Sequence, residues 1–289
     1  MRYQCIADHS DAYSVGVWCE ALGVSPSGYY RWKSTFSSAR RQEETQLKES
    51  IAAISREAKG RYGYRPMYHH LQSQCVSCGR DRTLRLMREM GLSCRRVKRF
   101  KPVGTDSNHG YGYAPNLLKE RESPTAINQV WTSDVTYVPT EEGWRYLATV
   151  MDLYSRHIIG WSVGEKNDTD LACRALYNAI AHRGGDLRGL IHHSDRGSTY
   201  ASYRYQKILS HNRIKASMSA KGNCYDNAAM ESFFGRFKTS TIKNTVYKNT
   251  AQLRDVVFEY IEISYNRFRK HAALGYLAPV EFEVKYSAE

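Results

Sequence analysis

Three carboxylates stand in the most distinctive strings of this 289-residue chain. Asp134 lies in VWTSDVTYV, Asp195 ends LRGLIHHSD, and Glu231 lies in NCYDNAAMESFFGRFK. Three such groups brought to one edge of a sheet can hold two divalent metal ions roughly 3.5–4 Å apart, an arrangement suited to in-line phosphoryl displacement. The sequence therefore predicts a metal-dependent site for phosphoryl transfer, made of Asp134, Asp195 and Glu231.

Two of these carboxylates are expected on strands. The β-branched and aromatic run at residues 130–138 predicts a buried strand, where an ionised Asp134 needs a strong compensating partner such as a metal ion. Asp195 closes an apolar stretch and precedes Arg196-Gly197-Ser198, so it is expected where a strand ends in a turn. Strand ends are where α/β sheets place their chemistry.

The third carboxylate is expected in the middle of a helix over residues 225–240, with Asn223 as a capping residue. Lys238 follows Glu231 by close to two helical turns, so both side chains should emerge on nearly the same face. A cation in that position can hold the phosphate beside the bond that is cut.

The remaining pattern of residues 127–289 predicts an α/β fold, an RNase H-like mixed sheet flanked by helices and followed by a helical extension. The expected strands and helices are strands 130–138, 143–151 and 156–163, helix 168–183, strand 188–194, helix 198–210, strand 214–218 and helix 225–240.

All-α helix-turn-helix modules are expected ahead of this core. Residues 12–32 predict two helices separated by a turn at Gly23, with Ser25 capping the second helix. The side chains that this second helix could offer to a DNA groove are Ser27, Tyr29, Tyr30 and Arg31.

A second helical module is expected over residues 59–92. In its last helix the spacing places Leu84, Met87 and Met90 in the core and the arginines on the outer face. Basic residues of this helix and of RRVKRFK favour contact with the DNA backbone, although a merely solvated face is the alternative. The DNA-binding candidates here are Arg82, Arg85, Arg88, Arg95, Arg96, Lys98 and Arg99.

These patterns divide the chain into four parts. Residues 1–50 form a helix-turn-helix module with a linker helix, and residues 51–105 form the second DNA-binding module. A Gly- and Pro-rich linker over 106–126 leads to the catalytic core at 127–289.

Composition agrees with a DNA-handling protein. The net charge is +13, with the larger share of the excess in the front half, which favours a polyanionic partner. No apolar run is long enough for a membrane span and no signal peptide is visible, so a cytoplasmic location and no membrane partner are expected. Seven cysteines without a dense spacing pattern indicate reduced thiols. A zinc site at Cys75 and Cys78 is disfavoured, because the adjacent His69 and His70 would diverge on a helix.

The strings WTSDVTY, HSDRGSTYAS, NCYDNAAMESFFGRFK and YNRFRKHAALGYLAPVEFE, in this order, resemble the second-reading-frame (OrfB) transposase of the IS-three family of bacterial insertion sequences. RYGYRPMYHHL resembles the second helical module of the same family. The core of that family is related to retroviral integrases. One departure is Thr199, which stands where the family usually has Gln.

The resemblance implies a DDE transposase that binds the terminal inverted repeats of its element and a target DNA. It implies two Mg²⁺ or Mn²⁺ ions per active site, with strand cleavage followed by strand transfer. It further implies a homo-oligomer on DNA, and a first-reading-frame protein as a fusion or partner. Two alternatives stay open at this point: an RNase H-like metal nuclease without strand transfer, and a DNA-binding regulator without catalysis.

Overall fold

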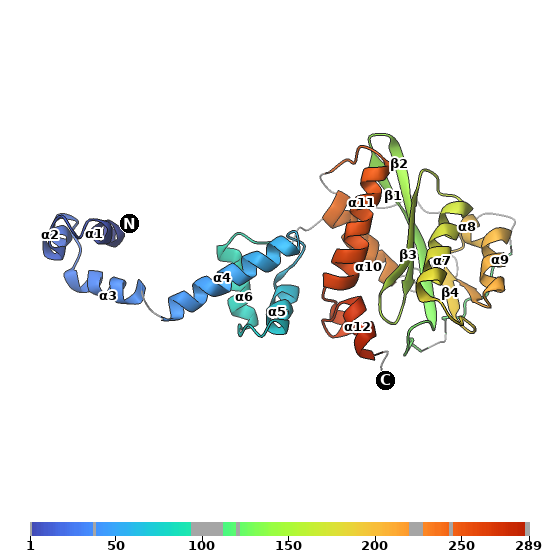
Figure 1. The fold of residues 1–289 in the computed structure, drawn as a ribbon, viewed down its shortest axis with the longest axis horizontal. Coiled ribbons are helices and arrows are strands. Elements are labelled where there is room, and N and C mark those ends of the chain that lie inside the picture. The colour runs from blue at the N-terminus through green and yellow to red at the C-terminus, as the bar shows by residue number, and fades with distance from the viewer. Residues whose placement is uncertain are drawn as a thin grey trace.

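The computed structural model describes residues 2–36, 39–93, 112–119, 122–219, 228–242 and 245–286. Its first unit consists of α1 (Arg2–Asp8), α2 (Val15–Ala21) and α3 (Pro26–Phe36) (Figure 1). The expected cap is present, since the Gly28 amide donates to Ser25 Oγ over 3.1 Å. Helix α1 was not expected from the sequence.

Tyr29 packs in the centre of this first unit with Ile6 and Cys19 and is fully buried. The expectation that Tyr29 is available to a DNA groove was therefore wrong. Its exposed neighbours Tyr30 and Arg31 lie on the outer side of α3.

The second unit consists of α4 (Ala39–Glu57), α5 (Tyr64–Ser73) and α6 (Arg80–Glu89). Its core includes Ile51, Met67 and Leu71. From α6 it takes Thr83, Leu86 and Met87, whereas Leu84 and Met90, expected in the core, are only partly buried. The polar residues from Ala39 onward form a regular helix rather than a linker, and their glutamates pair with arginines of α6.

A five-stranded mixed sheet forms the third unit, in the order β3-β2-β1-β4-β5. Antiparallel pairing joins β1 to β2 and β2 to β3, and parallel pairing joins β1 to β4 and β4 to β5. The strands are β1 (Val130–Thr140), β2 (Gly143–Asp152), β3 (Ile158–Gly164), β4 (Ile191–Ser194) and β5 (Lys215–Met218).

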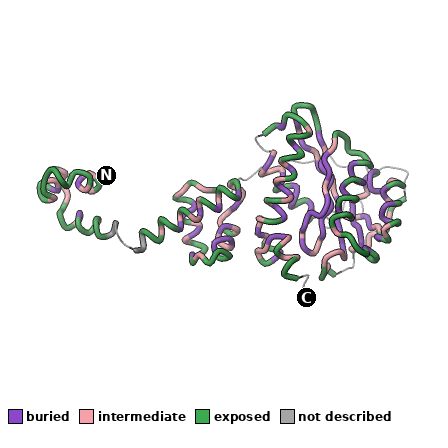
Figure 2. The backbone as a smooth tube through the Cα atoms, in the orientation of Figure 1, coloured by how far each residue is buried: buried purple, intermediate pink, exposed green. Residues whose placement is uncertain are grey.

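Helices cover both faces of the sheet (Figure 1), and the strands between them are buried (Figure 2). This confirms the RNase H-like α/β architecture. Among the described residues, no helix is both long and apolar enough to cross a membrane. One face carries α7 (Thr169–Arg183), α8 (Ser198–Ala201) and α9 (Tyr203–His211). The other carries α10 (Ala228–Phe237), the π-helical η2 (Lys238–Ile242), α11 (Thr250–Phe258) and the π-helical η3 (Glu259–Phe268). The 3-10 turn η4 (Ala272–Leu274) and α12 (Pro279–Tyr286) complete the described chain.

Two local features of the backbone shape these helices. One divides an expected helix, and the other allows a helix to pack unusually close to the sheet. The helix expected over 198–210 divides at Ser202, whose backbone is extended and whose side chain caps α9. Gly160 on β3 allows α7 to approach, because a Cβ there would lie 2.3 Å from the Ala175 carbonyl oxygen.

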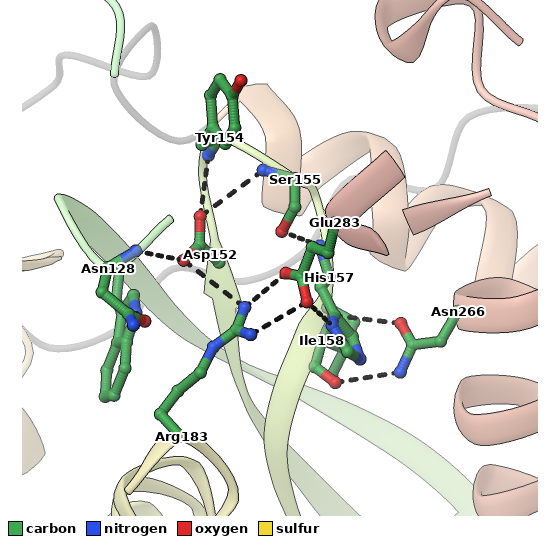
Figure 3. Close-up of polar contacts among 10 residues, drawn as sticks. Asn128, Asp152, Tyr154, Ser155, His157, Ile158, Arg183, Asn266 and Glu283 are labelled. Atoms are coloured by element: carbon green, nitrogen blue, oxygen red, sulfur yellow. Dashed lines mark hydrogen bonds and ion pairs between the residues drawn. The ribbon is translucent and has the colours of Figure 1, made fainter. Parts of the chain in front are cut away.

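A buried polar network ties α12 to the sheet (Figure 3). Arg183 lies between Asp152 and Glu283, and its Nη1 donates to Glu283 Oε2 over 2.9 Å. His157 Nδ1 lies 2.9 Å from the same oxygen. Burial would raise the pKa of Glu283, but the hydrogen bonds and charges of Arg183 and His157 outweigh it and hold that pKa far below its ordinary value. Asp152, which accepts the Asn128 and Tyr154 amides, therefore serves the turn and this network.

The histidine on β4 that faces α9 is also fully buried. His192 Nε2 lies 2.7 Å from Ser133 Oγ on β1 and 3.0 Å from the Tyr205 hydroxyl. Burial, with a smaller effect of His193, lowers the pKa of His192 to about 3. His192 therefore stays neutral in the folded protein.

This neutral histidine makes stability depend on pH. Between pH 6.5 and 3 the unfolded chain binds a proton at His192 that the folded chain does not, so stability falls as pH drops below about 6.5. We expect His192 to contribute about 1.4 kcal/mol of this loss per pH unit. Urea unfolding of His192→Gln from pH 7.5 to 4.5 should show lower stability at pH 7.5 but a shallower decline. The control is His211→Gln, at the exposed end of α9, in which the unfolding free energy should decline with pH as steeply as in the wild type. An equally steep decline in His192→Gln would contradict the prediction.

Candidate active site

Asp134 lies in the middle of β1 and is partly buried. Successive side chains of a strand point to opposite faces, so Asp134 shares the face of Val138, which α10 and α11 cover. Its Oδ1 accepts the amide of Val135 over 2.7 Å. This carboxylate is therefore held at the sheet surface below α10.

Asp195 directly follows β4, as the sequence predicted. The parallel ladder between β1 and β4 ends with Thr132 opposite His193, and Asp134 and Asp195 each stand two residues further along. Continued by two residues, this register would bring the two aspartates onto one face of the sheet, with Asp195 just after β4. Asp195 Oδ1 also accepts the Gly197 amide over 2.9 Å, which fixes the turn into α8.

Glu231 lies in the first described turn of α10 and is exposed. The buried face of this helix, Met230, Phe233, Phe234 and Phe237, packs on the side of the sheet that carries Asp134. Residues 220–227, including Asn223, lie outside the described residues. Within the described part of the chain, no three Asp, Glu, His or Cys side chains lie close enough to share a metal ion. The structure thus places both aspartates just beyond the β1–β4 ladder, while the roles of Asp134, Asp195 and Glu231 stay predictions.

Lys238 begins η2, directly after α10, and is half-buried. Its Nζ lies 4.2 Å from the centre of the Tyr137 ring on β1. Burial lowers the pKa of Lys238, and the charge of Asp134 opposes this shift only in part. The predicted phosphate-binding cation is therefore close enough to β1 to interact with Asp134.

Tyr200 on α8 is a site residue that the sequence reasoning missed. It is 3% exposed, and among the described residues its hydroxyl has no hydrogen-bond partner. Burial raises the pKa of Tyr200 well above its ordinary value, and Tyr205, Asp134 and Asp195 raise it further. The hydroxyl therefore lies near both aspartates, and its position directly after HSDRGST was the signal available in the sequence.

The donor set fits a hard divalent cation. Asp134 and Asp195 supply carboxylate oxygens near Tyr200, and the Tyr200 hydroxyl is a buried polar group that has no partner within the described chain. Mg²⁺ and Mn²⁺ prefer oxygen ligands, and a cation relieves the repulsion between two adjacent carboxylates. The neighbouring His193 is bonded to Ser217 on β5 at 2.9 Å, and Thr199 is buried.

The DNA-binding candidates are placed differently from one another. Arg82 Nη1 lies 2.7 Å from Glu43, and Arg85 pairs with Glu44 at 2.9 Å. Arg88 and Arg31 are exposed on α6 and α3. The remaining candidates Arg95, Arg96, Lys98 and Arg99 lie outside the described residues.

Comparison with known proteins decides the family. An "Integrase core domain" model matches residues 124–224, a second model of that description matches 212–279, and an "HTH-like domain" model matches 41–100. The chain is 38% identical to "Transposase InsF for insertion sequence IS3A" of Escherichia coli K12, over 99% of both chains. The chain belongs to the IS-three (IS3) family of insertion-sequence transposases. Within this family it is also 43% identical to the "Insertion element IS600 uncharacterized 31 kDa protein" of Shigella sonnei, over 93% of this chain and 98% of that one.

Among solved structures, the chain is similar to one in the simian T-cell lymphotropic virus intasome in complex with PP2A regulatory subunit B56 gamma. The TM-score is 0.46 with 16% identity, and the match covers 79% of this chain and 73% of that one. It is also similar to the HTLV-2 integrase catalytic core domain in complex with magnesium. There the TM-score is 0.38 with 16% identity, covering 55% of this chain and 97% of that one.

Removing the Tyr200 hydroxyl should not destabilise this transposase. A buried hydroxyl without a partner opposes folding, so Tyr200→Phe should leave the unfolding free energy of the metal-free protein unchanged or raise it by about 1 kcal/mol. Tyr205→Phe is the matched control, because it removes a hydroxyl that is bonded to His192 and should lower stability by about 1 kcal/mol. Denaturant unfolding measures both, and equal losses in the two variants would show that Tyr200 has a partner.

Proposed function

We propose that this transposase cuts the ends of its element and transfers the freed 3′-ends to a new phosphodiester, using Asp134, Asp195 and Glu231 as metal ligands. The observation that supports it most directly is the parallel pairing of β1 with β4, because Asp134 and Asp195 each lie two residues beyond the last pair of that ladder. Two carboxylates next to the β1–β4 ladder, together with a helix that carries a glutamate and is followed by a lysine, form a set suited to phosphoryl transfer.

Two Mg²⁺ or Mn²⁺ ions, when bound, supply activation of the attacking oxygen and stabilisation of the leaving 3′-oxygen. Asp134 is the ligand proposed to serve both ions, with Asp195 and Glu231 each serving one. Lys238 holds the phosphate next to the scissile bond as a point charge. The Tyr137 ring holds the Lys238 ammonium group through a cation–π contact. The chain's own residues thus orient the phosphate and its metal ligands, and no Ser, Cys or His nucleophile is required.

The helical units ahead of the core are proposed to bind the terminal inverted repeats. Arg31 on α3 and Arg88 on α6 are exposed, and they are the described candidates best placed for DNA phosphates. The same proposal includes the homo-oligomer on DNA and the first-reading-frame partner. It also includes the domain division at residues 50, 105 and 126.

A metal nuclease without strand transfer would use the same carboxylates. Transposition is favoured because the match to the transposase relative runs over 99% of both chains, including the helical units and the C-terminal segment that a plain nuclease does not require. Incubation of the purified protein and Mg²⁺ with a labelled element end separates the two: joined products support transposition, and nicked products alone support a nuclease.

Glu231→Gln tests the proposed helical ligand of the triad. The amide keeps the side-chain volume but removes the charge, so cutting and joining should both be lost, while DNA binding persists or tightens slightly. Glu141→Gln, an exposed glutamate after β1, is the matched control and should stay active. An unchanged joining rate in Glu231→Gln would exclude this residue from the metal site.

Lys238→Ala tests the phosphate contact. Metal affinity, measured by calorimetry, should change little because lysine is not a metal ligand, whereas joining should drop by about tenfold to a hundredfold. Lys248→Ala removes an exposed lysine from the same half of the chain and should leave joining unchanged. If Lys238→Ala emptied the metal site instead, the proposed role of this lysine would be wrong.

A further inference from the structure

Arg61, just before α5, reaches across to the start of η3. Its Nη1 donates to Ser264 Oγ over 2.7 Å, and its Nη2 lies 3.2 Å from Glu259 Oε2. Burial would raise the pKa of Glu259, but the hydrogen bond and charge of Arg61, assisted by Lys59, hold that pKa below its ordinary value. A paired guanidinium with an 11% exposed side chain is a specific contact rather than a loose surface pair.

Aromatic contacts extend the same surface. Tyr62 stacks on Phe268 with ring centres 5.4 Å apart, and its hydroxyl donates to the Phe268 carbonyl over 2.7 Å. Further along α5, the His69 ring stacks on Tyr276. Tyr276 and Gly275 have positive φ angles of 62° and 60°, so the backbone bends tightly to present the Tyr276 ring to α5. We name the contact between residues 59–70 and 259–276 the docking surface.

The docking surface continues to the helix that carries the candidate site residues. Arg61 Cζ lies 5.3 Å from the centre of the Tyr260 ring, and Tyr260 packs against Phe237 at 5.2 Å. Phe237 is the last residue of α10 and precedes Lys238. One side chain, that of Tyr260, therefore links Arg61 beside the second helical unit to Phe237 at the end of α10.

Two strings that stood out in the sequence meet here, RYGYRPMYHHL and YNRFRKHAALGYLAP, and the proposed chemistry uses neither of them. We propose that the docking surface holds the DNA-binding α4–α6 unit in a fixed position relative to Lys238 and Glu231, with Arg61 and Glu259 as positioning residues. The proposal rests on the proposed function. It means that the distance from the bound terminal repeat to the cut is set inside one chain, by this contact.

Charge reversal in the full chain tests the proposal. Arg61→Glu and Glu259→Arg each place like charges in contact, so each should reduce site-specific end cleavage by at least about tenfold and spread the positions of cutting. The two changes shift the net charge in opposite directions, so equal losses cannot come from general DNA affinity. The double variant restores an ion pair and should recover most of the cleavage. End binding, measured by gel shift, should stay within about threefold in all three.

Tyr276→Asn provides a second variant that spares folding, because Asn tolerates a positive φ while the ring stack with His69 is lost. It should keep the wild-type melting temperature and still spread the cut positions. Site-specific cleavage that stays normal in both single reversals and in Tyr276→Asn would overturn the proposal, as would a double variant whose loss equals the product of the two single losses. Failure of the proposed function is distinguishable, because then the wild-type chain itself would not cut ends.

Discussion

The backbone pairing of β1 with β4 positions both aspartates of the candidate site, because Asp134 and Asp195 each lie two residues beyond the last pair of this ladder. On the opposite face of the same strands, His192 is bonded to Ser133 and Tyr205 in a fully buried cluster. This cluster joins the two strands where the ladder ends. A buried, neutral group of side chains therefore supports the strands that carry or precede the aspartates.

The helix that carries Glu231, α10, packs on the face of the sheet that Asp134 shares with Val138. The phenylalanines of α10 pack on strand residues beneath them and on Tyr260 and Tyr265 of η3, so the helix is held from both sides. Lys238 follows this helix where the backbone changes to a π-helical turn, a local geometry frequent at functional sites. The ammonium group of Lys238 lies over the Tyr137 ring because α10 ends directly before Lys238.

Local patterns in the sequence predicted the strand around Asp134, the strand end before Asp195 and the order of strands and helices along the core, because β-branched runs and turn residues are local signals. The β1–β4 register and the docking surface pair residues far apart in the chain, and no local pattern encodes such pairings. The inner side of α6 shows a similar limit. The sequence pattern predicted Leu84 and Met90 there, whereas the structure buries Thr83 and Leu86. Neighbouring faces of a helix differ little in pattern, and the packing partner decides which face is buried. Tyr200 was missed because a buried hydroxyl is recognised only by the absence of a partner within the described structure.

The glutamates of α4 have a consequence for the proposed contact of α6 with DNA. Arg82 pairs with Glu43 and Arg85 pairs with Glu44, so a phosphate bound at either arginine would compete with a carboxylate. Under the proposed function, such competition would reduce the net release of small cations per contact and would make weak encounters with arbitrary DNA less favourable. The proposed DNA-binding unit would then favour long-lived residence on a well-matched terminal repeat over sliding along bulk chromosome.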